Sequence, residues 1–169
     1  MNETPQEYIS RILGYQNGKV PMKILAATPK TIASLIRGKS AALLKKRPQP
    51  DKWSAAEIIA HLADTDLVFG FRLRLALGQS GVTIQAFDQE VWADFGKYSK
   101  TNPKESLATL TALRGHNLRM LKNLPKEMWE NFGMHTERGK ETITRMSEMF
   151  AGHDINHLMQ IERIVKKKK

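Results

Sequence analysis

Apolar side chains recur every three to four residues through most of this 169-residue chain, which is the spacing of helices that bury one face. Alternation typical of strands is rare by comparison. The spacing therefore predicts an all-α protein built as a helical bundle. The expected helices cover residues 6–17, residues 29–47 with an interruption at Gly38, residues 55–77, residues 103–124 and residues 144–164.

Capping signals mark where these helices begin. Thr28-Pro29 is typical of an N-cap followed by proline at the first helical position. Ser54 and Glu57 have the spacing of a capping box, in which the serine accepts from the third amide and the glutamate reaches back. Asn102, followed by proline, marks a third start. The helix that follows Ser54 is on the order of 36 Å long, enough to span a bundle.

Two stretches lack helical spacing. Residues 78–102 hold glycines, polar residues and scattered aromatics, which indicates a long crossing connection with helical turns near Asp88–Asp94. Residues 128–144 are irregular as well. A small hairpin is expected there, from 132–135 to 138–140, before Thr144 caps the last helix.

Composition indicates one ordinary domain. Hydrophobic residues make up 41% and charged residues 26%, as in globular proteins rather than disordered ones. We expect a single domain over 1–169, with an N-terminal extension over 1–20 and a basic tail over 166–169. No stretch approaches the roughly 20 apolar residues of a membrane helix. The first residues lack the layout of a signal peptide, so we expect a cytoplasmic protein without a membrane partner.

The chain carries a formal net charge of +10. The excess is concentrated in residues 1–50, where nine Lys and Arg face two Glu, whereas residues 51–100 hold five against seven acidic residues. Such a surface can attract nucleic acid through its phosphates, but we favour a solvated basic face over specific binding. The absence of cysteine from the sequence excludes disulfides, thiolate metal sites and cysteine nucleophiles.

Three histidines stand on the apolar faces of two expected helices. His153 and His157 are four residues apart, so their rings share one helix face, and that face is the buried one. His61 lies in the apolar stripe of the helix over residues 55–77. A buried imidazole without a partner costs about 1–3 kcal/mol. A shared metal ion would supply that partner, although core histidines bonded to side chains or water are a common alternative.

Other polar residues near this pattern have weaker assignments. Asp64 lies one turn after His61. It could be a fourth metal ligand, a carboxylate that orients a ligand, or an exposed carboxylate. Asp154 points about 100° away from His153 around the helix, which argues against both residues binding one metal ion. We expect the two remaining histidines, His116 and His135, on the surface. The further candidates for lining a pocket are Arg72, Trp92, Tyr98 and Gln160, with a surface position favoured for Arg72.

The order of these motifs resembles the DinB/YfiT-like superfamily. The resemblance rests on Trp53-Ser54 with Glu57, on 61–64 (His-Leu-Ala-Asp), and on 153–161 with its two histidines. It implies a four-helix bundle with an up-down-down-up path, which accommodates the long crossing connection. It also implies a divalent metal held by residues matching His61, His153 and His157, often in a homodimer. Characterised relatives include S-transferases that use small thiols and a mycothiol-dependent isomerase.

These observations favour a metal-dependent enzyme that acts on a small molecule. Three neutral imidazoles suit zinc, nickel, iron or manganese, and we favour zinc or nickel. The reaction would be thiol S-transfer, with a low-molecular-weight thiol as cosubstrate, or hydrolysis by activated water, with Asp64 as the candidate catalytic residue. The alternatives are a non-catalytic bundle that binds a ligand and is stabilised by metal, and a basic protein that associates weakly with nucleic acid.

Overall fold

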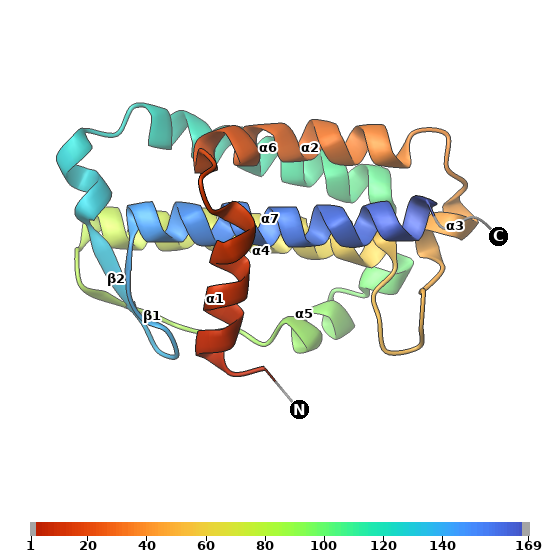
Figure 1. Cartoon of the computed structure of the whole chain (residues 1–169), viewed down its shortest axis with the longest axis horizontal. Helices are drawn as coiled ribbons and strands as arrows, with labels where there is room; N and C mark the ends of the chain where they lie inside the picture. Colours follow the sequence, from red (N-terminus) through yellow and green to blue (C-terminus); the bar gives the residue numbers. More distant parts are fainter. Residues whose placement is uncertain (1–2, 167–169) are drawn as a thin grey trace.

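Four long helices form the body of the protein and lie along a common axis (Figure 1). In this computed structural model, which describes residues 3–166, they are α2 (Pro21–Ile36), α4 (Ala55–Gly78), α6 (Pro103–Lys122) and α7 (Ile143–Lys166). In Figure 1, α2 and α7 run in one direction, and α4 and α6 run in the other. This is the expected up-down-down-up path. Because α4 and α6 are parallel, the chain between them must return along the bundle, and the predicted crossing connection does so.

Five shorter helices and three strands complete the described part of the chain. The short helices are α1 (Pro5–Gln16), α3 (Ala41–Lys45), α5 (Gln89–Phe95), η1 (Tyr98–Lys100) and η2 (Lys126–Glu130). The strands β1 (Val82–Ile84), β2 (Phe132–His135) and β3 (Gly139–Thr142) form one small sheet. β1 pairs parallel to β2, and β2 pairs antiparallel to β3. The predicted hairpin is confirmed, whereas β1 was not predicted because three residues are too few to show alternation.

Most predicted helix starts are confirmed. Ser54 and Glu57 form a complete capping box, in which the Ser54 N–H donates to Glu57 at 2.8 Å. The Asn102 side chain caps α6. Two starts were wrong. The last helix is capped by the hydroxyl of Thr142, which accepts from the Arg145 N–H at 3.0 Å, rather than by Thr144. The first bundle helix begins at Pro21, not at Thr28-Pro29.

A buried arginine explains why α2 continues through Pro29. Proline has no N–H, so the carbonyl one turn earlier, that of Leu25, loses its helical donor. Arg114 of α6 replaces it, donating from Nη1 to the Leu25 oxygen at 2.8 Å. The Thr28 hydroxyl also turns inward to the helix, donating to the Ile24 carbonyl at 3.0 Å. A contact from another helix thus allows α2 to continue through the residues that were predicted to begin a helix.

The core consists of two apolar clusters separated by a polar layer. One cluster joins the ends of the helices around Ile59, Leu110 and Ile161, and the other surrounds Phe69 and Leu118. The layer between them holds buried charged and polar residues from all four bundle helices. Its members include Thr28, His61, Asp66, Arg114, Asp154 and His157. Buried polar groups need hydrogen-bond or ionic partners, so the side chains of this layer depend on specific contacts with one another.

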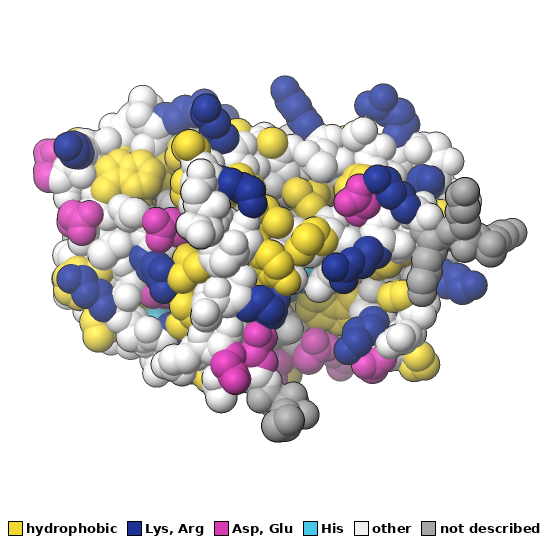
Figure 2. Space-filling model, viewed as in Figure 1, with side chains coloured by type: hydrophobic (Ala, Val, Ile, Leu, Met, Phe, Trp, Pro, Cys, Tyr) yellow, Lys and Arg dark blue, Asp and Glu magenta, His cyan; other side chains and the backbone are white. Residues whose placement is uncertain are grey.

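Charge and hydropathy add little to this picture. Within the described residues, no helix is both long and apolar enough to traverse a bilayer. Figure 2 shows Lys and Arg side chains spread over the visible face and interspersed with acidic and apolar ones, rather than gathered into one continuous patch. Lys166 ends α7, and the remainder of the predicted basic tail lies outside the described residues.

Candidate metal centre

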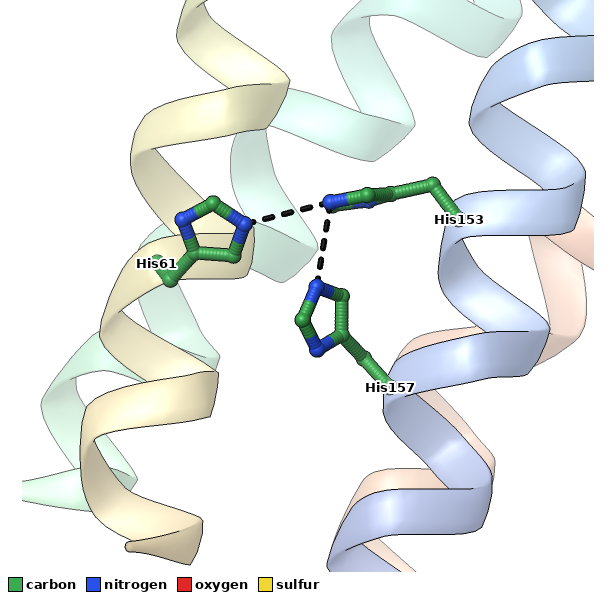
Figure 3. A group of neighbouring side chains, drawn as sticks. All are labelled: His61, His153 and His157. Carbon is green, nitrogen blue, oxygen red and sulfur yellow. Dashed lines mark hydrogen bonds between the residues drawn. The ribbon is translucent and has the colours of Figure 1, made fainter. Parts of the chain in front are cut away.

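Three histidine side chains from two helices meet in the polar layer (Figure 3). His61 projects from α4, whereas His153 and His157 project from successive turns of α7. The Nε2 atom of His153 lies 3.1 Å from Nε2 of His61 and 3.1 Å from Nε2 of His157. The structure therefore brings together the three residues that the helical spacing singled out.

Hydrogen bonds among the rings cannot satisfy this arrangement. A neutral imidazole offers one N–H donor and one acceptor nitrogen. Nδ1 of His157 lies 2.9 Å from Oε1 of Gln160, and because an amide oxygen only accepts, Nδ1 carries the proton and Nε2 presents a lone pair. His153 must therefore donate to that lone pair, and its Nε2 then has no lone pair and no second hydrogen for His61. One of the two nitrogen–nitrogen contacts needs an electrophile between the rings.

A divalent cation fits these nitrogens. Zinc–nitrogen bonds are about 2.0–2.1 Å long, so two ligand nitrogens on one ion lie about 3.0–3.4 Å apart, and the observed separations are 3.1 Å. Burial holds the pKa of His61 and of His153 well below the usual value and lowers the pKa of His157 to about 4. All three rings are therefore neutral near pH 7, with lone pairs available for a metal.

The Trp53 side chain and helix α1 enclose the histidines. The Trp53 ring packs against His61 with ring centroids 4.8 Å apart. Helix α1 crosses α7 beside the site (Figure 1). This crossing requires Gly152, because a Cβ there would lie 2.8 Å from the carbonyl carbon of Ile12 and closer still to its oxygen. The segment expected to be an extension is thus part of the site wall.

Two cavities, both lined in part by α1, reach the histidines. The larger, of about 700 Å³, is lined by His153, His157, Trp53 and Gln160 among others. The smaller, of about 320 Å³, is lined by His61 and His153 and follows the groove between α4 and α7. Tyr8 of α1 lines both. The three-histidine group is therefore accessible to a small molecule, which suits a catalytic site better than a closed structural one.

A buried charge network supports the α7 segment that carries the histidines. Arg114 donates from Nε to Asp66 at 2.5 Å and from Nη1 to Asp154 at 2.6 Å. Asn117 donates to Asp66 at 2.8 Å. The side chains of Arg114, Asp66 and Asp154 are all at most 2% exposed. Asp154 points away from His153, as its position on the helix predicted, and it anchors α7 to α6.

Asp64 lies outside the three-histidine group. Its Oδ2 accepts a hydrogen bond from the Tyr98 hydroxyl at 2.5 Å, and both residues line a separate cavity beside α6. Burial, followed by the bond to Asp64, raises the pKa of Tyr98. Tyr98 in turn meets the edge of Trp53, with ring centroids 6.2 Å apart. Asp64 is therefore linked to the histidines only indirectly, because it bonds Tyr98, Tyr98 contacts Trp53, and Trp53 packs against His61.

The remaining candidates divide between the surface and the interior. His116 is exposed, as expected. The surface position expected for His135 was wrong: the residue is 3% exposed because β2 turns Gly133 and His135 inward. The surface position favoured for Arg72 was also wrong, since it is 6% exposed and lines the smaller cavity. Trp92 packs against Phe87, with ring centroids 4.7 Å apart.

Sequence comparison links the chain to proteins named for metal-dependent hydrolysis. A protein of Oceanobacillus iheyensis named "Putative metal-dependent hydrolase OB0782" is 30% identical over 117 residues, which cover 69% of this chain and 67% of that protein. YfiT of Bacillus subtilis, with the same functional name, is 25% identical over 116 residues, which cover 66% of this chain and 65% of that protein. The matched segment thus spans about two thirds of each relative.

The fold and the family agree with this link. The solved structure of YfiT, described as having an unusual four-helix bundle topology, superposes with a TM-score of 0.77, covering 85% of this chain and 84% of that one at 20% sequence identity. The family model of the DinB superfamily matches residues 24–161, which contain all three histidines. The chain therefore belongs to the DinB superfamily.

Proposed function

We propose that this protein is a metal-dependent hydrolase of a small molecule, with one divalent ion held by His61, His153 and His157. The observation that carries the proposal is the convergence of three neutral Nε2 atoms, 3.1 Å apart in two pairs, where hydrogen bonds cannot satisfy them all. The names of the relatives support hydrolysis as the reaction. Zinc or nickel is the ion we favour, because both accept an all-imidazole ligand set.

A bound ion would supply Lewis-acid chemistry, lowering the pKa of a water or thiol molecule that reaches it towards neutrality. The protein supplies the positioning. The Oε1 atom of Gln160 accepts a hydrogen bond from the Nδ1–H of His157 and so fixes which nitrogen faces the site. Trp53 covers His61 and restricts water on that side. Tyr8 of α1 lines both cavities, so α1 forms part of the wall along which a substrate would approach the histidines.

Asp64 enters the proposal as a positioning residue rather than as the catalytic base. Its carboxylate holds the Tyr98 hydroxyl, and Tyr98 supports the Trp53 ring that packs on His61. A homodimer, expected from the family resemblance, remains a prediction that a mass measurement in solution tests.

The test compares metal-loaded protein, metal-free protein and His153→Ala. Each is assayed with an activated ester, 4-nitrophenyl acetate, and separately with cysteamine and an aryl halide. Ester hydrolysis that needs the metal and is lost in His153→Ala supports the hydrolase. Turnover of the thiol pair alone would support S-transfer instead. His116→Ala, an exposed histidine on α6, is the matched control and should behave like wild type. Equal ester turnover with and without metal would contradict the proposal.

A further inference from the structure

The smaller cavity has two chemically different ends. At one end are His61 and His153, and at the other is Arg72, eleven residues further along α4. Eleven residues correspond to about 16 Å of helix, and the long Arg72 side chain leans back towards the N-terminus of α4. The cavity lining includes the apolar side chains of Phe87, Met149 and Phe150, together with the polar side chains of Thr65 and Gln89. The cavity thus connects the histidine nitrogens to a cation, with apolar side chains on part of its wall.

Arg72 is a buried cation without a carboxylate partner. It is 6% exposed, and within the described part of the chain it forms no salt bridge. Its Nη2 donates to the backbone oxygen of Gln85 at 2.6 Å, and its guanidinium carbon lies 5.7 Å from the centre of the Phe87 ring. Burial and the nearby Arg138 lower the pKa of Arg72 to about 10, so it is charged at neutral pH.

The neighbouring charges define what kind of anion would fit. Arg138, which also lines the cavity, is already paired with Glu141 at 2.7 Å. Glu137 lies exposed at the rim and makes the cavity less favourable to highly charged anions. One unpaired guanidinium therefore offers a single positive charge. Its planar fork matches a carboxylate, which carries one negative charge and accepts two parallel hydrogen bonds.

We propose that Arg72 binds the carboxylate of the substrate, and that the substrate is an apolar monocarboxylate whose reacting bond lies at the opposite end from that carboxylate. The inference rests on the proposed function, because it places the reacting bond at the three-histidine end. A buried, unpaired charge lowers stability unless it is used in binding. The positions of Phe87, Met149 and Phe150 supply the apolar contacts between the two ends.

The test uses hydroxamates, which bind metal ions, on the zinc-loaded protein. One series carries a carboxylate at the far end of an alkyl chain, and a matched series of equal length ends in a methyl group. Wild type should bind the best carboxylate compound about 10- to 100-fold more tightly than its methyl partner, as expected for a charge-assisted hydrogen bond. Arg72→Met should abolish this preference. Arg74→Met, an exposed arginine two residues away on α4, should retain it.

Folding and metal binding are controlled separately. Arg72→Met should fold, because it removes an unpaired buried charge, and circular dichroism checks this. If that variant does not fold, Arg72→Lys replaces it and should reduce the preference severalfold, because lysine keeps the charge but loses the fork. An equal affinity of wild type for the two series, or a preference that survives in Arg72→Met, would overturn the proposal.

Failure of the metal site would look different. If neither series binds, the proposed function fails, and 4-phenylbutyrate, which needs no metal, then tests Arg72 on the metal-free protein. Binding that is lost in Arg72→Met but kept in Arg74→Met would sustain the carboxylate site. Absence of such a difference would overturn it.

Discussion

Replacing Arg114 by methionine should expose how much the polar layer depends on one side chain. Arg114 is fully enclosed, and it forms ion pairs with two buried carboxylates and satisfies the Leu25 carbonyl left free by Pro29. Methionine keeps most of the volume but leaves Asp66 and Asp154 as buried anions without a cation. Removing one partner from such a group typically costs about 3–5 kcal/mol. We expect a loss of that size in the free energy of unfolding.

Urea denaturation followed by circular dichroism measures the loss at pH 7.5. The matched control is Arg119→Met, which removes an exposed arginine from the same helix and should change stability by less than about 0.5 kcal/mol. In a protein of this length, the Arg114→Met loss corresponds to a fall in Tm of roughly 6–20 °C. A change within 1 kcal/mol of the control would refute the assignment of Arg114 as the central ion of the layer.

The pH dependence gives a second check with a defined sign. Burial already raises the pKa of Asp66 in the wild type, and Arg114 opposes that rise. Without Arg114 the folded-state pKa of Asp66 rises further above the unfolded value of about 3.9. The folded variant then binds more protons than the unfolded chain, so its stability increases as pH falls. The deficit relative to wild type should therefore shrink between pH 7.5 and pH 5; a constant deficit would mean that the unpaired Asp66 carboxylate is not the cause.

Three further substitutions test the site. Gly152→Ala should push α1 away from α7, which lowers the free energy of unfolding by about 1–3 kcal/mol and increases hydrogen exchange in α1. The control Gly115→Ala, whose new Cβ would have its nearest contact 3.5 Å away, should not destabilise the protein. Equal effects of the two substitutions would contradict the close approach of α1 to α7. Gln160→Ala should weaken zinc affinity about 10- to 100-fold through His157, measured by competition with a chelator; unchanged affinity would remove Gln160 from the site. Asp64→Asn should keep the metal and lower ester turnover less than about tenfold, whereas a loss of the 10²–10⁴-fold size typical of a general base would make Asp64 the base itself.

The sequence was most informative where one helix face decides the outcome. His61, His153 and His157 could be placed together because their spacing puts them on buried faces of long helices, and the capping box at Ser54 fixes where α4 begins. Helical spacing and capping are local rules, and local rules suffice to predict which side of a helix faces the core. The path of the bundle came from the family resemblance rather than from periodicity.

Contacts between distant segments accounted for three of the wrong predictions, those at Pro29, Arg72 and His135. Pro29 reads as a helix start, but a donor from α6 allows the helix to pass through it. Arg72 and His135 read as surface residues because nothing nearby in the sequence shows that the crossing connection and the sheet cover them. The Arg114 network did leave a signal. Arg114 stands in the leucine stripe of α6, between Leu110 and Leu118, where a charged residue requires a buried partner.

The most direct test of this account is the metal content of three purified proteins after incubation with zinc and removal of free ions. Wild type and His116→Ala should each retain about one ion per chain, and His61→Ala should retain almost none, because it removes the only ligand from α4 and leaves two imidazoles on α7. Full retention of zinc by His61→Ala would contradict the claim that the two helices hold one ion between them.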